Sequence, residues 1–81
     1  MIVRIAFVDG SIKEYEIAMK NASRLKLITK LRSAQCILLA QRITWNPTTK
    51  SITGRITTDV FLNINNMISI ELVSLDEGNH E

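Results

Sequence analysis

The alternation of apolar and polar residues at the start of the chain predicts a β-hairpin over residues 2–17, "IVRIAFVDGSIKEYEI". A two-residue loop would set glutamates opposite isoleucine and valine and so mix carboxylates into the apolar face. A three-residue loop over positions 8–10, with Gly10 in the left-handed conformation, avoids this. That register also predicts an ion pair between Arg4 and Glu14. The apolar face it predicts consists of Val3, Ile5, Phe7, Tyr15 and Ile17.

Apolar residues at helical spacing predict one helix over residues 21–35, "NASRLKLITKLRSAQ", with Asn21 as its N-cap. The face expected to lie on the sheet consists of Leu27, Ile28, Leu31 and Ala34. Residues 36–45 follow as the predicted central strand. Its first part, "CILLA", is apolar at every position, which is typical of a strand covered on both faces.

The segment "NPTTK" after Trp45 predicts a turn over residues 46–49, because Asn and Pro favour the first two positions of a type I turn. The glycine at position 54 would then mark a bend or bulge in the returning strand. The predicted cross-strand pairs are Trp45 with Lys50, Ile43 with Ile52, Leu39 with Ile56, and Gly54 with Gln41.

The segment over residues 60–73, "VFLNINNMISIELV", contains two strand-like runs joined without glycine or proline. The three residues between the runs must change the direction of the chain without a reversing hairpin, so we predict a single 3₁₀ turn. Asparagines favour such a turn because their side chains bond nearby backbone groups. The alternating apolar positions are Val60, Leu62 and Ile64 in one run and Ile68, Ile70 and Leu72 in the next.

This stretch resembles the last two strands of Sm-like and SH3-like small barrels, and is similar to the "L-N-x-x-x-I-x-x-I-E" start of small flagellar FlbD-type proteins. Those places are filled by Leu62, Asn63, Met67, Ile70 and Glu71, with Met67 where isoleucine is usual. The resemblance implies a bent strand corner and, in Sm-like proteins, rings or dimers formed through sheet edges. A hairpin before the helix departs from the usual Sm order, so only the geometry is carried over, and not RNA binding.

These elements predict an α+β fold in the order β-β-α-β-β-β-β: a strongly bent antiparallel sheet or open small barrel with one helix packed on it. A chain of 81 residues has room for one core, so we expect one domain over residues 1–75 and a mobile polar tail over 76–81.

Candidate chemistry is sparse. The one histidine, His80, lies in the polar tail, and the one cysteine, Cys36, opens an apolar strand where a thiol is usually a small buried hydrophobe. The three glycines are isolated, and no residues have metal-ligand spacing. We therefore expect no enzymatic activity, metal or cofactor. With a single cysteine and charge soon after the N-terminus, we expect a cytoplasmic protein without a signal peptide or membrane span.

Charge is distributed unevenly, although the formal net charge is only +2. No acidic residue occurs between Glu16 and Asp59, an interval that holds eight basic residues, whereas residues 59–81 carry five acids and no lysine or arginine. Such asymmetry predicts a positive surface on the helix and the central hairpin. The alternative is a solvated helix whose basic side chains cover apolar edges.

The charge pattern predicts a small non-enzymatic binding or regulatory module that holds an acidic protein partner. A nucleic acid, RNA or DNA, is the alternative partner, and a homo-oligomer paired through edge strands is a third interpretation. Trp45 is either an exposed anchor or the cap of a small core. The length and composition also suit a phage or mobile-element accessory protein. The predicted binding residues are Lys26, Lys30, Arg32, Arg42, Trp45, Lys50 and Arg55.

Overall fold

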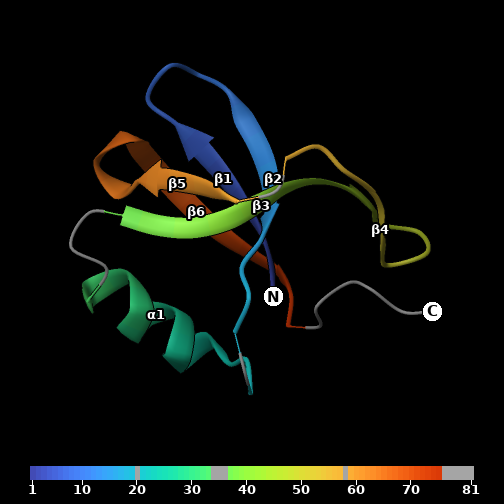
Figure 1. Cartoon of the computed structure of the whole chain (residues 1–81), viewed down its shortest axis with the longest axis horizontal. Coiled ribbons are helices and arrows are strands. Elements are labelled where there is room, and N and C mark those ends of the chain that lie inside the picture. Colours follow the sequence, from blue (N-terminus) through green and yellow to red (C-terminus); the bar gives the residue numbers. More distant parts are fainter. Residues whose placement is uncertain (20, 34–36, 58, 76–81) are drawn as a thin grey trace.

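The computed structural model describes residues 1–19, 21–33, 37–57 and 59–75, and in these ranges it has six strands and one α-helix (Figure 1). All strand pairs are antiparallel, in the order β4-β3-β2-β1-β6, with β5 also paired to β3. The sheet is strongly bent and open, so the predicted α+β fold is confirmed. The elements are β1 (Ile2–Phe7), β2 (Ile12–Glu16), α1 (Arg24–Ser33), β3 (Ile37–Asn46), β4 (Ser51–Arg55), β5 (Val60–Asn63) and β6 (Met67–Ser74).

The β1–β2 hairpin has the predicted register. Val3 lies opposite Tyr15 and Arg4 lies opposite Glu14. Gly10 has a φ of 90°, a conformation that side-chain-bearing residues rarely adopt, and it closes the three-residue loop. The predicted face is inside the molecule, because most of its members belong to the core. The buried core consists of Met1, Val3, Ile5, Tyr15, Ile17, Leu27, Leu38, Ala40 and Leu62, with Phe7 packed against it.

Helix α1 begins at Arg24, so the prediction that it starts at Asn21 is wrong. Ser23 is the N-cap, because its Oγ accepts a hydrogen bond from the Lys26 N–H at 3.1 Å. Asn21 instead has a φ of 54°, which places it in a left-handed turn before the helix. Leu27 is buried, as predicted, whereas the predicted face residue Ala34 lies outside the described residues.

The first part of β3, residues 37–40, is covered on one face only, so the prediction of cover on both faces is wrong for these residues. Leu38 and Ala40 are buried, while Ile37 and Leu39 are exposed. The bend of the sheet explains this, because it encloses one face of β3 and turns the other outward. Cys36, predicted to open this strand, lies outside the described residues.

The predicted β3–β4 register is wrong. Trp45 lies opposite Ile52, not Lys50, and Gly54 lies opposite Thr44, not Gln41. Likewise Ile43 does not pair with Ile52, nor Leu39 with Ile56: the strand partners are Arg55 for Ile43 and Phe61 for Leu39.

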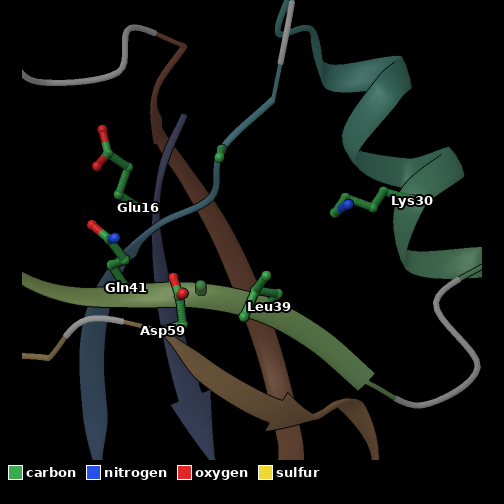
Figure 2. Close-up of a pocket in the computed structure, with 7 residues that line it drawn as sticks. Glu16, Lys30, Leu39, Gln41 and Asp59 are labelled. Carbon is green, nitrogen blue, oxygen red and sulfur yellow. The ribbon is translucent and has the colours of Figure 1, made fainter.

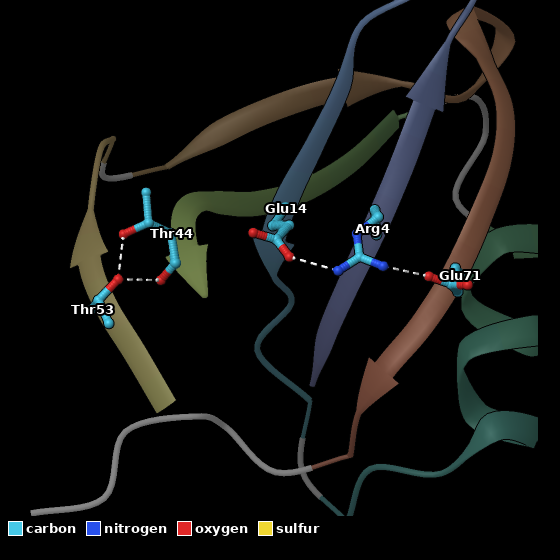
Figure 3. Close-up of polar contacts among 5 residues, drawn as sticks. All are labelled: Arg4, Glu14, Thr44, Thr53 and Glu71. Atoms are coloured by element: carbon cyan, nitrogen blue, oxygen red, sulfur yellow. Dashed lines mark hydrogen bonds and ion pairs between the residues drawn. The ribbon is translucent and has the colours of Figure 1, made fainter. Parts of the chain in front are cut away.

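Two local features explain why the β3–β4 register differs from the predicted one. The Asn46 carbonyl accepts a hydrogen bond from the Lys50 N–H at 2.8 Å, and its Oδ1 accepts one from the Thr48 N–H at 2.9 Å, so the turn spans residues 47–50. The register then shifts between Thr44 and Trp45. This irregularity leaves Thr53 as the additional residue on β4, where its Oγ1 lies 2.8 Å from that of Thr44 (Figure 3).

The predicted 3₁₀ turn is confirmed, and it spans Ile64–Asn66 as η1. Asn63 caps the turn with its side chain, which accepts a hydrogen bond from the Asn65 N–H at 2.9 Å. Two predictions nearby are wrong: Ile64 belongs to the turn and not to β5, and Ile68 is exposed. The exposure of Ile68 follows from a bulge, because Phe7 pairs with Met67 and Ala6 with Ser69.

Candidate binding surfaces

Ion pairs within the protein neutralise part of the charge on the outer face of the sheet. Arg4 lies between two glutamates, 3.0 Å from Glu14 on β2 and 2.8 Å from Glu71 on β6 (Figure 3). The hydrogen bond to Glu14 is the main cause that raises the pKa of Arg4. Arg55 is bound in the same way by Glu16 and by the side-chain carbonyl of Gln41. Arg55, predicted to bind a partner, is therefore already engaged within the sheet.

Apart from Arg42, the remaining predicted binding residues fall into two groups at opposite ends of the molecule (Figure 1). Lys26, Lys30 and Arg32 are on α1, whereas Lys50 is in the turn between β3 and β4. Trp45 is half-buried near that turn. The structure therefore does not gather the predicted residues into one continuous surface. Arg42 belongs to neither group, and lies within β3 opposite Tyr15.

The exposed side of α1 combines positive charge with apolar groups. The helix carries four basic residues and no acidic one: Arg24, Lys26, Lys30 and Arg32. Leu25 is 73% exposed and Ile28 40%, although Ile28 had been predicted to lie on the sheet. Since Leu25, Ile28 and Arg32 are spaced i, i+3 and i+7, they share one side of the helix. We call Arg24, Leu25, Ile28 and Arg32 the α1 outer surface.

A hollow of about 180 Å³ lies between Lys30 of α1 and β3, and its lining consists of Glu16, Ala18, Lys30, Leu39, Ala40, Gln41 and Asp59. Figure 2 shows Leu39 between two kinds of charge, with Glu16 and Asp59 on one side and Lys30 on the other. Phe61 lies directly opposite Leu39 in the β3–β5 pairing and is 72% exposed. This region thus presents an apolar centre with opposite charges at its two sides.

A second, more open groove of about 430 Å³ lies between the β1–β2 hairpin and the β5–η1 corner. Its lining includes three aromatic side chains, those of Phe7, Tyr15 and Phe61. The rings of Phe7 and Tyr15 meet edge to face with centroids 6.2 Å apart, and the Lys13 Nζ lies 5.7 Å from the centre of the Phe7 ring. Burial raises the pKa of Tyr15, and the positive charge of Arg42 opposes this effect.

Sequence reasoning missed the apolar members of these surfaces. Leu39 was assigned to a strand covered on both faces, and Leu25 received no role. The sequence did contain one indication. Successive side chains of a strand point to opposite faces, so if Leu38 faces the core, Leu39 faces outward. The same alternation, applied to Val60, Phe61 and Leu62, sends Phe61 outward beside Leu39.

Within the described ranges, no three His, Cys, Asp or Glu side chains gather as a metal site would require. His80 and Cys36 lie outside these ranges. None of the helices in the described part of the chain combines the length and apolar character needed to cross a membrane. Comparisons with protein-family models, curated proteins and solved structures found no match to this chain.

Proposed function

We propose that this chain is a small non-enzymatic binding module that holds an acidic protein partner on the α1 outer surface. The observation that carries the proposal is the presence of two exposed apolar side chains, Leu25 and Ile28, on a ten-residue helix that has four basic residues and no acidic one. Apolar side chains on an exposed helix face suit helix-to-groove recognition, and the arginines select an acidic rim around it.

A protein partner is favoured over nucleic acid because the exposed groups alternate in chemistry. A surface that follows a phosphate backbone needs a row of cations, and affinity then depends on the number of phosphates neutralised. Leu25 and Ile28 interrupt such a row on α1, and Arg55 is engaged by Glu16 on the sheet. The two exposed apolar groups would contribute little to contacts with phosphate.

Single-stranded nucleic acid is the second candidate, and the aromatic groove is the observation that favours it. Exposed Phe61 offers a ring on which a base can stack, and Lys13 is close by. The groove also contains Asp9, whose pKa is lowered chiefly by the hydrogen bond from the Ser11 hydroxyl. An ionised carboxylate repels phosphate, so this groove has a weaker claim than α1.

The test begins with the full chain in its native host, with a photo-reactive residue replacing Leu25 to capture whatever contacts α1. The same residue at Ile12, 65% exposed on β2, serves as the control position. The captured protein is then purified and its affinity measured for the wild type and for the double variant Arg24→Glu/Arg32→Glu. We expect that variant to bind about tenfold more weakly or worse, because two favourable charge contacts become repulsive.

A matched variant with the same total charge change, Lys13→Glu/Lys50→Glu, alters cations that lie away from α1 and should bind as the wild type does. Equal losses of affinity in both double variants would overturn the proposal, since binding would then depend on the net charge of the chain alone. So would a random-sequence single-stranded DNA that binds as tightly as the captured protein at physiological salt.

A further inference from the structure

We infer that two copies of this chain dock face to face through the exposed side of β3 and β5. The surface concerned, here called the dimer face, consists of Lys30, Leu39, Asp59 and Phe61. The inference concerns another surface and another partner than the proposed function, and it does not depend on that function.

The centre of the dimer face is apolar and exposed. Leu39 on β3 and Phe61 on β5 are direct cross-strand neighbours, with 45% and 72% of their surfaces exposed. Ile37, two residues before Leu39 on the same face of β3, is 54% exposed and extends the patch. Contiguous apolar side chains of this size on a strand pair mark a contact surface, because their burial excludes water from both partners.

The charges around this centre select a second copy as the partner. Lys30 and Asp59 lie on opposite sides of Leu39 (Figure 2), and neither forms an ion pair with any other residue in the described ranges. A two-fold axis through the apolar centre would place Lys30 of each copy over Asp59 of the other. The contact between Lys30 and Asp59 then occurs twice, once in each direction. The surface is therefore complementary to itself in both charge and apolar character.

Other partners match this face less well. An acidic protein would meet Asp59, and a basic one would meet Lys30. Glu16, which also lines the hollow, is neutralised by Arg55 and so does not disturb the balance of one positive and one negative group. The hollow of about 180 Å³ beside Leu39 gives the exposed ring of the partner's Phe61 a place to insert as an anchor.

This contact differs from association through sheet edges, because it uses side chains on the face of β3 and β5. The edge of β6 that faces away from β1 takes no part. A small contact of this kind is expected to be weak, with dissociation in the micromolar to millimolar range.

Sedimentation velocity of the full chain, from low micromolar to about millimolar concentration, tests the inference. We expect a concentration-dependent dimer whose dissociation constant rises about tenfold or more in Lys30→Glu and in Asp59→Lys, because each single reversal puts like charges together twice. The double variant Lys30→Glu/Asp59→Lys restores opposite charges across the axis. Its dissociation constant should return to within a few-fold of the wild-type value.

Phe61→Ser should weaken the dimer as each single reversal does, whereas Ile68→Ser should not. Ile68 is 68% exposed, nearly as much as Phe61, but it lies on the β6 bulge, outside the dimer face. Thermal unfolding of each variant checks that its fold is kept. A wild type that stays monomeric at all concentrations would overturn the inference. Single reversals without effect, or a double variant no tighter than the singles, would overturn it as well.

Discussion

Tyr15 places a titrating phenol group in the buried core. It is the only tyrosine of the chain, and 4% of its surface is exposed. Removing the phenol from water penalises the phenolate, so burial raises the pKa of Tyr15 above its ordinary value of 10.0, against the opposing charge of Arg42. Well below pH 10 the folded and unfolded chains both hold this proton.

As the pH rises above 10, the unfolded chain loses the Tyr15 proton before the folded chain does. The free energy of unfolding should therefore fall with rising pH until the folded pKa is passed. Urea unfolding from about pH 9 to about pH 11.5 measures this fall. In Tyr15→Phe the fall should be smaller, because the buried phenol is gone; equal falls in both proteins would contradict the prediction.

A contact between two side chains could be predicted from the sequence where the register of their two strands could also be predicted. Arg4 beside Glu14 followed from the three-residue loop, whose alternatives put carboxylates on the apolar face. Arg55 beside Glu16 could not be predicted, because it depends on the additional residue in β4 at Thr53. In the short strand β4, the extra residue leaves no recognisable mark in the hydrophobic pattern.

At the scale of elements, the bulge in β6 makes Met67 and Ile70 share the inner face although they are three residues apart. Deleting Ile68 would restore regular alternation, with both side chains still directed inward. Deleting Glu71 instead would exchange the inward and outward side-chain positions on one side of the deletion. Core side chains there would then point to solvent. The two deletions therefore differ in whether the lost residue was the additional one, and the Glu71 deletion also removes the ion pair with Arg4.

We expect the Ile68 deletion to lower the free energy of unfolding by roughly 1 kcal/mol, through the lost bend, and the Glu71 deletion to lower it by more than about 3 kcal/mol through lost core contacts. Urea unfolding followed by circular dichroism compares them. Two deletions of equal cost would show that β6 does not depend on the register assigned to it here.

The position of this corner, though not its bulge, was predictable. The asparagines around Ile64 signalled the 3₁₀ turn because their side chains bond the local backbone. The bulge depends on how β6 pairs with β1, sixty or more residues away in the chain. A short stretch of sequence does not show which distant segments will pair. For the same reason, the charged residues predicted to form one surface are found at two ends of the molecule.

At the scale of the whole molecule, the bent sheet gives adjacent leucines of β3 opposite environments. Leu38 is 1% exposed and belongs to the core, while Leu39 is 45% exposed. Leu38→Ala should cost about 2 to 5 kcal/mol, a large share of the roughly 4 to 12 kcal/mol expected for a domain of this length. Leu39→Ala should cost about 0.5 kcal/mol or less when measured at concentrations where the protein is monomeric.

Denaturant unfolding of the two variants under identical conditions provides the measurement. Since both substitutions remove the same atoms from neighbouring positions, differences in side-chain chemistry cancel. Similar losses of stability would contradict the one-sided cover of β3. A loss at Leu38 alone would support it, and Leu39→Ala would then be expected to act only on association.

The pairing of β1 with β6 also determines when the molecule can first fold. Ile2–Phe7 leaves the ribosome well before its partner Met67–Ser74, which is made about sixty residues later. During synthesis one side of β1 therefore stays without its strand partner, and closing the sheet requires a long loop to form first. The complete core is thus assembled only after β6 has emerged, and until then the nascent chain exposes apolar residues that a chaperone can bind.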